Sequence, residues 1–255
     1  MRVAWLCEAP TWGPAMRALA VLGPGTDVEG VVLGQRSEVD NEVLIAERVP
    51  FVHVGCCGDD SMEHHLARTE ADVLVADACW APLAAADGRP YITLGMHGAG
   101  EWDLDSMPLH PWTWQALPRR VDVRALFDVP EDVPVVAIMS NATRVNVIEN
   151  AVARWAPSHA VVVSLHGPFV ARRMVGADLV VTSAGWASSW EARWSGVPYV
   201  LVDVGGPDQP RRATHTFDEA REAVSAVTLA DLSPGHTAQP EDHVTDFCAV
   251  LRRLA

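Results

Sequence analysis

The chain of 255 residues contains no lysine, because all nineteen of its basic residues are arginine. A lysine side chain is required for Schiff-base chemistry, for the phosphate loop of nucleoside triphosphatases and for the ATP contact of protein kinases. The absence of lysine therefore excludes these three classes of enzyme.

Positive charge is also in short supply. The 33 acidic residues outnumber the basic ones and give a net charge of −14. A negative field of this size repels nucleic-acid backbones and anionic lipid, so we expect neither as a partner. A small anionic ligand remains compatible with this charge, because main-chain N–H groups at a helix start act at short range.

Cysteine motifs and long apolar runs are missing too. The five cysteines are odd in number and form no Cys-x-x-Cys pair, which indicates reduced thiols rather than a disulfide framework or a zinc site. No segment approaches the ~20 apolar residues that span a bilayer. The apolar run within Met1 to Pro10 is too short for the core of a signal peptide. We expect a soluble, cytoplasmic protein.

What the sequence does contain is an alternation of short apolar runs and helix-like stretches. Continuous apolar runs are typical of strands buried on both faces, as in a parallel sheet covered by helices. The fold class predicted is α/β. The expected strands are Arg2 to Cys7, Val28 to Leu33, Phe51 to Val54, Val73 to Ala76, Tyr91 to Leu94, Val135 to Met139, Ala160 to Leu165, Leu179 to Thr182 and Tyr199 to Val202.

The alternation lapses between Glu101 and Pro134, where proline and tryptophan accumulate. Such a segment is typical of a connection between domains. We therefore predict two Rossmann-like parallel-sheet domains facing across a cleft. Residues 1–130 would form the N-terminal domain, and residues 131–255 the C-terminal domain.

The most informative segment runs from Ala177 to Ala213. It reads as a strand, a turn of small residues, a helix, Gly-Val-Pro, a second strand and Gly-Gly-Pro-Asp-Gln. Ser188 and Ser189 fall in the first turn of the helix, where unpaired N–H groups and the positive dipole end accept phosphate oxygens. Glu191 lies one turn further on, a suitable distance for binding a ribose diol.

This segment resembles the donor-site signature of the GT-B glycosyltransferase superfamily. The turn Ser188-Ser189-Trp190-Glu191 is similar to that of the shorter UDP-sugar hydrolases of the pseudaminic-acid pathway. The segment also resembles the N-acetylglucosaminyltransferase of peptidoglycan lipid synthesis. The resemblance implies a GT-B fold and a donor site for a nucleotide-sugar made by Gly13, Ser140, Asn141, Thr143, His166, Phe169, Gly185, Ser188, Ser189, Glu191, Asp208 and Gln209.

Within that site the resemblance implies separate roles. Gly185, Ser188 and Ser189 would contact the diphosphate, Glu191 the ribose, and Asp208 with Gln209 the sugar hydroxyls. Ser140, Asn141 and Thr143 would close the phosphate site from the other side. The nucleobase would lodge in the loop from His166 to Phe169.

The catalytic base is less directly indicated. The segment from Trp12 to Arg17 resembles the Gly-Gly-His-x-x-Arg loop of the superfamily, but Pro14 stands where the relatives carry their catalytic histidine. A base must come from a strand's carboxyl end in the N-terminal half. Glu8 and His97 satisfy this condition, and an unperturbed imidazole titrates nearer neutral pH.

No metal site is predicted. Asp103 and Asp105 form an Asp-x-Asp run, but no other feature of a metal-dependent donor site accompanies it. The adjacent His64 and His65 point about 100° apart on a helix and so do not share one ion.

These observations predict a metal-independent glycosyltransferase that moves a sugar from a UDP- or dTDP-type donor to a small acceptor, without any further cofactor. Two alternatives stay open. One is a nucleotide-sugar hydrolase of the same fold, and the other is a non-catalytic nucleotide-sugar-binding subunit. The oligomeric state, including a homodimer, also stays open.

Overall fold

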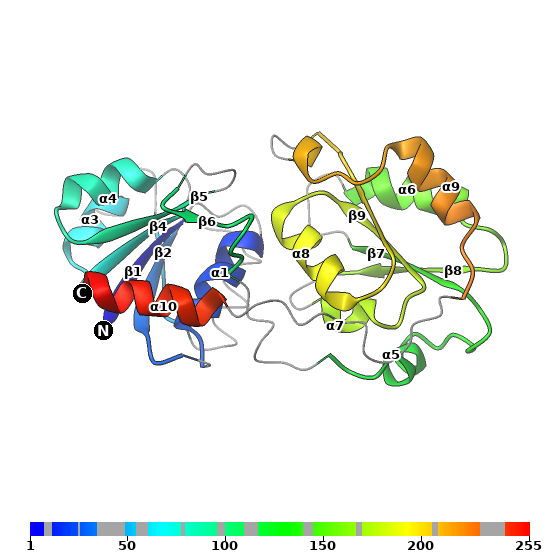
Figure 1. Ribbon diagram of the computed structural model, residues 1–255, viewed down its shortest axis with the longest axis horizontal. Helices are drawn as coiled ribbons and strands as arrows, with labels where there is room; N and C mark the ends of the chain where they lie inside the picture. The colour runs from blue at the N-terminus through cyan, green and yellow to red at the C-terminus, as the bar shows by residue number, and fades with distance from the viewer. Residues whose placement is uncertain are drawn as a thin grey trace. The chain divides into compact units, whose positions relative to one another are not determined.

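The computed structural model describes residues 1–7, 12–24, 26–34, 49–54, 61–77, 80–95, 100–109, 117–139, 145–166, 170–205, 209–229 and 243–255. The chain divides into two compact units (Figure 1). Unit 1 comprises Met1–Gln115 and Glu241–Ala255, and unit 2 comprises Ala116–Pro240. Each unit contains a parallel sheet with helices, which confirms the predicted α/β fold.

Unit 1 is built on a six-stranded sheet in the order β3-β2-β1-β4-β5-β6. This order is that of dinucleotide-binding Rossmann domains. The short strand β6 was not predicted, because two residues carry no readable periodicity. The strands are β1 (Arg2–Cys7), β2 (Glu29–Gly34), β3 (Phe51–His53), β4 (Val73–Asp77), β5 (Tyr91–Gly95) and β6 (Trp102–Asp103), and the helices are α1 (Trp12–Leu22), α3 (Met62–Ala67), α4 (Ala81–Asp87) and α10 (His243–Leu254).

The C-terminal helix α10 belongs to unit 1. Its Phe247 is fully buried and makes edge-on contacts with Trp5 of β1 and Trp102 of β6, at ring-centroid distances of 6.2 and 4.8 Å. Figure 1 shows α10, in red, against the first sheet. Helices α3 and α4 cover the opposite face, where Leu6 packs with Leu66 in one apolar cluster. Residues 241–255 thus complete the first core, whereas the sequence pattern assigned them to the second domain.

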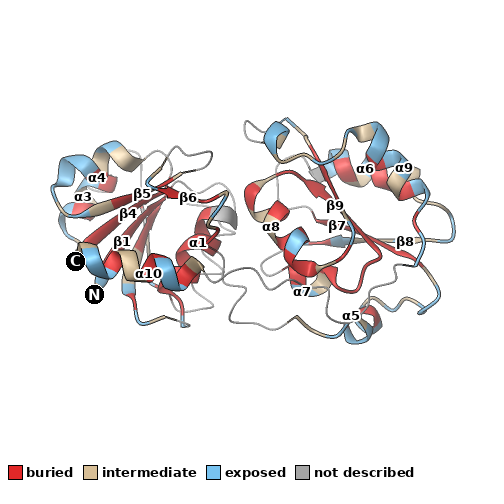
Figure 2. Cartoon of the chain, viewed as in Figure 1, coloured by how far each residue is buried: buried red, intermediate tan, exposed pale blue. Residues whose placement is uncertain are grey.

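Unit 2 holds a four-stranded sheet in the order β10-β9-β7-β8. Alternate residues of its strands enter two different cores: Ala137 faces Met174, and Ile138 faces Val152. Burial on both faces explains the continuous apolar runs of the central strands β7 and β9, which are red in Figure 2, whereas most of the edge strand β8 is exposed or half-buried. The strands are β7 (Val135–Met139), β8 (Val161–Leu165), β9 (Leu179–Ser183) and β10 (Tyr199–Val202), and the helices are α5 (Arg120–Leu126), α6 (Val145–Trp155), α7 (Ala171–Met174), α8 (Trp186–Ser195), the 3₁₀ helix η4 (Gln209–Arg211) and α9 (Phe217–Ser225).

Local sequence signals set the ends of several helices. The side chain of Thr216 accepts from the Glu219 backbone N–H at the start of α9, and the Glu219 carboxylate accepts from Thr216 in return. The hydrogen bonds that the Glu219 carboxylate accepts from Thr216 lower the pKa of this carboxyl, because they stabilise its charged form. Helix α8 ends at Gly196, whose φ of 70° is a left-handed conformation that glycine adopts without strain.

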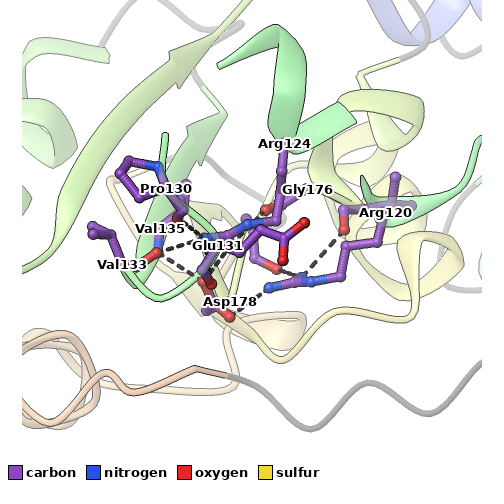
Figure 3. Close-up of polar contacts among 10 residues, drawn as sticks. Arg120, Arg124, Pro130, Glu131, Val133, Val135, Gly176 and Asp178 are labelled. Carbon is purple, nitrogen blue, oxygen red and sulfur yellow. Dashed lines mark hydrogen bonds and ion pairs between the residues drawn. The ribbon is translucent and has the colours of Figure 1, made fainter. Parts of the chain in front are cut away.

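A buried ion cluster attaches α5 to unit 2 (Figure 3). The Asp178 carboxylate accepts hydrogen bonds from the guanidinium groups of Arg120 and Arg124 and from the backbone N–H of Val135. Arg124 also donates to the carbonyl groups of Gly176 and Val133. Burial lowers the pKa of the Arg120 guanidinium, and the charge of Asp178 opposes that shift.

This cluster explains why residues 117–130 lie in unit 2, although a single boundary between residues 130 and 131 was expected. The anchoring arginines are on α5, and their carboxylate partner precedes β9, more than fifty residues later in the chain. The Pro-rich composition indicated a connection between domains in this region. It did not show that α5, at the end of the region, packs on the core of unit 2.

The cluster generates a stability prediction. Among the described residues, Asp178 is the only carboxylate that forms an ion pair with both Arg120 and Arg124. Asp178→Asn removes this charge and should lower the free energy of unfolding by about 3 kcal/mol or more. Urea denaturation followed by circular dichroism measures the change. The matched control is Asp122→Asn, which breaks an exposed ion pair with Arg119 and should leave the unfolding midpoint unchanged. Equal midpoints for the two variants would show that the cluster does not hold α5.

Candidate functional site

The candidate site lies at the carboxyl edge of the unit 2 sheet. Strand β7 pairs with β8 on one side and with β9 on the other. After β8 the chain crosses back to the other side of β7, so the strand order switches direction between β7 and β9. Ligands of open α/β sheets bind in the crevice outside such a switch point. The turn that leaves β9 at this edge is Ser183, Ala184 and Gly185, and it leads directly into α8.

The N-terminus of α8 lacks a neutralising group. Gly185 is the N-cap residue and makes no side-chain cap, and the first turn contains no acidic residue. The first amides of an α-helix have no intrahelical acceptor, and at this helix start it is the Ser189 backbone N–H that donates to the Gly185 carbonyl oxygen. Unpaired amides combine with the positive end of the helix dipole to favour a bound anion.

Ser188 and Ser189 are both buried at this helix start, as the sequence predicted. The Ser189 hydroxyl donates to the Gly185 carbonyl oxygen at 2.8 Å, and the Ser189 backbone N–H donates to the same oxygen at 2.9 Å. Ser189 thus fixes the conformation of the turn. Ser188 Oγ lies 3.7 Å from the position that a Cβ on Gly185 would occupy, so the structure brings these three residues together.

Glu191 is 2% exposed, and it lies one turn further along α8. Its Oε2 accepts a hydrogen bond of 2.9 Å from the backbone N–H of Ala171, the first residue of α7. His166, which follows β8 directly, is exposed, and its carbonyl oxygen accepts from the Arg173 guanidinium. The start of the segment from His166 to Phe169, which was expected to hold a nucleobase, is therefore bonded to a neighbouring side chain.

Gln209 begins the 3₁₀ helix that follows β10. Its Oε1 accepts from the Val204 backbone N–H at 2.8 Å, so the side chain bonds to the residues that leave β10. Asp203 accepts from the Gly205 backbone N–H at 2.7 Å in the same stretch. Gln209 therefore shapes the chain at the carboxyl end of β10, beside the end of β9.

Other site residues predicted from the sequence lie outside the described residues. The sequence predicted a loop from Trp12 to Arg17. In the structure this segment is helical, since α1 begins at Trp12 and continues to Leu22. Gly13, a predicted nucleotide-sugar contact, therefore lies within a helix rather than in a loop, and Pro14 is buried there. The predicted residues outside the description are Glu8, His97, Ser140, Asn141, Thr143, Phe169 and Asp208.

Unit 1 contains a buried ion pair that the sequence analysis missed. Arg17 of α1 donates from Nε and from one terminal nitrogen to the two carboxylate oxygens of Asp77, each at 2.9 Å. Both side chains are nearly inaccessible, and Asp77 is the last residue of β4. An aspartate that ends an apolar run was a readable signal, but its partner lies sixty residues away in the chain.

No group of three or more potential metal ligands is found among the described residues. Asp103 accepts from the Asp105 backbone N–H at 3.1 Å and from the Ser106 hydroxyl at 2.9 Å, so its carboxylate stabilises a turn. None of the helices in the described ranges is long and apolar enough to cross a membrane.

A cavity of about 680 Å³ lies in unit 1 at the opposite edge of the sheet from its carboxyl ends. Arg2 and Glu29, at the starts of β1 and β2, line it together with Leu22 and Val28. Its position at the starts of the strands separates it from the Arg17–Asp77 pair, because Asp77 lies at the carboxyl end of β4.

The geometry of Gly185 generates a second prediction. Its φ of −66° suits any residue, and an added Cβ would meet nothing closer than 3.7 Å. Gly185→Ala should therefore retain the wild-type free energy of unfolding or raise it by up to about 1 kcal/mol. Gly176→Ala is the matched control, because its Cβ would lie 2.7 Å from Phe127 Cε2 and should destabilise the protein. A large stability loss in Gly185→Ala would mean that the glycine serves folding.

No protein family model and no curated protein sequence matches the chain. Solved structures are nevertheless similar along its whole length. The glycosyltransferase of kitacinnamycin is 16% identical, covers 99% of this chain and 95% of its own, and gives a TM-score of 0.54. The calicheamicin glycosyltransferase CalG4 is 14% identical, with coverages of 99% and 93% and a TM-score of 0.55. A putative UDP-N-acetylglucosamine 2-epimerase from Listeria monocytogenes is 11% identical, with coverages of 99% and 96% and a TM-score of 0.54. The chain therefore has the fold of GT-B glycosyltransferases.

Proposed function

We propose that this protein is a glycosyltransferase that takes its sugar from a nucleotide-activated donor and binds the donor diphosphate at the start of α8. The observation that carries the proposal is the uncapped, unneutralised N-terminus of α8 at the switch point of the unit 2 sheet. Gly185, Ser188 and Ser189, which resemble the GT-B donor pattern, lie at that position. The GT-B fold of the whole chain supports the same assignment.

In this proposal each part of the donor has its own contacts. The amides of α8 with Gly185, Ser188 and Ser189 bind the diphosphate, and hydrogen bonds to charged groups of this kind contribute about 1.5–3 kcal/mol each. Glu191 binds the ribose, and the segment that begins at His166 holds the base. The remaining proposed contacts follow β7, β8 and β10 in the sequence and are Ser140, Asn141, Thr143, Phe169, Asp208 and Gln209.

The chemistry proposed is a direct displacement at the anomeric carbon. A base in unit 1 removes the proton of the acceptor hydroxyl as its oxygen forms the new bond, and the bond to the diphosphate breaks with both electrons going to the leaving oxygen. The amides at the start of α8 stabilise the negative charge that develops on the diphosphate. This arrangement asks for no metal and no further cofactor, and the proposed setting is the cytoplasm, with small molecules as donor and acceptor.

One observation favours a second candidate, a non-catalytic nucleotide-sugar-binding subunit. Pro14 occupies the position at which the superfamily carries its catalytic histidine, and it is buried within α1. A proline offers no side-chain atom that accepts a proton. The two candidates differ in turnover but share the donor site.

Ligand binding tests the shared site. A nucleoside diphosphate at about 100 times its Kd should stabilise the protein by about 2.7 kcal/mol, which a thermal-shift screen of UDP, dTDP, ADP and GDP detects as a raised Tm. Gly185→Ala should bind at least about tenfold more weakly, because its methyl group occupies the surface that the diphosphate approaches. The screen argues against the proposal if no diphosphate raises the Tm, or if Gly185→Ala binds as tightly as wild type.

Turnover separates the candidates. With UDP- or dTDP-sugar and a panel of small acceptors, the transferase should form glycosylated product, and it should continue to do so in EDTA. Release of free sugar without any acceptor would instead identify the hydrolase. Tight binding without turnover would identify the binding subunit.

The catalytic base gives a separate prediction. His97→Ala should lower kcat by about 10²-fold or more while leaving the Kd for the nucleoside diphosphate nearly unchanged, because general-base catalysis acts only in the chemical step. Glu8→Ala is the second variant, since Glu8 directly follows β1 in the sequence, as the segment with His97 follows β5. Full turnover in the double variant would contradict both assignments.

A further inference from the structure

Strand β8 forms one edge of the unit 2 sheet, and it differs from the other sheet edges in the described part of the chain. The edge strands of unit 1, β3 and β6, are only three and two residues long. At the opposite edge of unit 2, the Leu201 carbonyl oxygen of β10 accepts from the Thr214 backbone N–H at 2.9 Å, and Val202 bridges to His215. A short or covered edge gives little template for a further strand, whereas β8 offers five residues.

The backbone of β8 directs hydrogen-bonding groups away from the sheet. Strand β8 pairs in parallel with β7, and the Val161 N–H donates to the Pro134 carbonyl oxygen at 2.8 Å. The N–H and C=O groups of successive residues point to opposite sides of a strand, so those of Val161 and Val163 face β7. The groups of Val162 and Ser164 therefore point outward, where a partner strand would bind them.

The side chains of β8 are mostly apolar and incompletely covered. The strand reads Val-Val-Val-Ser-Leu and contains neither a charged residue nor a proline. Val161 is 36% exposed, and Val162 and Val163 are half-buried at the margins of the two apolar clusters of unit 2. Charged residues and proline are the usual means by which an edge strand avoids pairing with another chain. Without them, β8 is suited to such pairing.

The charges at the two ends of β8 favour a second copy of this chain as the partner. Glu131 and Asp132 are exposed, and they closely precede Pro134, which bonds the start of β8. At the other end, the exposed His166 follows β8, and the Arg173 guanidinium donates to its carbonyl oxygen. In an antiparallel pair of β8 strands, the acidic start of each copy would lie near the basic end of the other.

We propose that β8 pairs antiparallel with β8 of a second copy, about a twofold axis at Val163. In this register Val162 lies opposite Ser164 of the second copy, and these residues exchange N–H···O bonds. Val161 lies opposite Leu165 of the second copy, which covers the exposed part of the valine side chain. The unit 2 sheets of both copies then form one continuous sheet, and the interface is isologous, as in a closed dimer. This interface does not depend on the proposed function.

Sedimentation equilibrium of the full chain, over a series of protein concentrations, measures the Kd of the dimer. Wild type should show a concentration-dependent equilibrium between monomer and dimer. Val162→Pro removes an outward N–H donor from each copy and should raise this Kd by about tenfold or more. The monomer should stay folded, because proline is tolerated in an edge strand where its nitrogen faces solvent.

Val161→Arg is the second variant, because it places a positive charge opposite Leu165 and near Arg173 of the second copy. It should also raise the Kd of the dimer. The matched control is Val121→Arg, which adds the same charge at an exposed valine of α5. Helix α5 is bonded to Asp178, just before β9, and not to β8, so this variant should dimerise as wild type does.

Circular dichroism establishes that each variant is folded, and Val161→Arg decides the question if Val162→Pro is not. A wild type that stays monomeric up to its solubility limit would overturn the proposal. A dimer whose Kd is unchanged in the folded β8 variants would overturn it as well, as would one that Val121→Arg weakens equally. None of these outcomes bears on the binding of nucleoside diphosphates, which tests the proposed function separately.

Discussion

The second unit depends on one buried carboxylate. Asp178 receives Arg120, Arg124 and the Val135 backbone N–H, and so connects α5 to the starts of both central strands, β7 and β9. A buried charge is stabilised by close partners that hydrogen-bond to it, so removing any one of these groups would destabilise the others. Because β7 and β9 pair in a fixed parallel register, their carboxyl ends lie at the same edge of the sheet. The position of the α8 N-terminus follows from that register.

Around this edge, polar side chains are bonded mainly to the backbone. Ser189 stabilises the turn at Gly185, Gln209 bonds to the residues that leave β10, and Glu191 holds the start of α7. Each bond orders a connection that would otherwise have many conformations, at a cost in entropy that is met on folding rather than on ligand binding. The site is therefore preorganised by the same residue types that the sequence pattern associates with a donor.

Gly185 differs from these residues in what the fold requires of it. Neither its backbone conformation nor its surroundings exclude a side chain. By contrast, Gly176 at the other end of β9 faces Phe127 and Val123, so there the fold itself requires a glycine. A glycine without a structural reason, at the uncapped start of a helix, is consistent with the close approach of a ligand to the backbone.

The sequence by itself determined the α/β class, the nine main strands and the grouping of Gly185, Ser188 and Ser189, because these depend on local periodicity and on residues close together in one helix turn. Only the tertiary structure decided that α10 completes the first core, that α5 is bound to the second, that Trp12 begins a helix and that Arg17 pairs with Asp77. Phe247 lies more than 140 residues from Trp102, and Arg124 more than fifty from Asp178. Contacts between residues so far apart produce no periodic pattern in the sequence. They form because buried apolar surfaces and buried charges need partners once the sheets have formed.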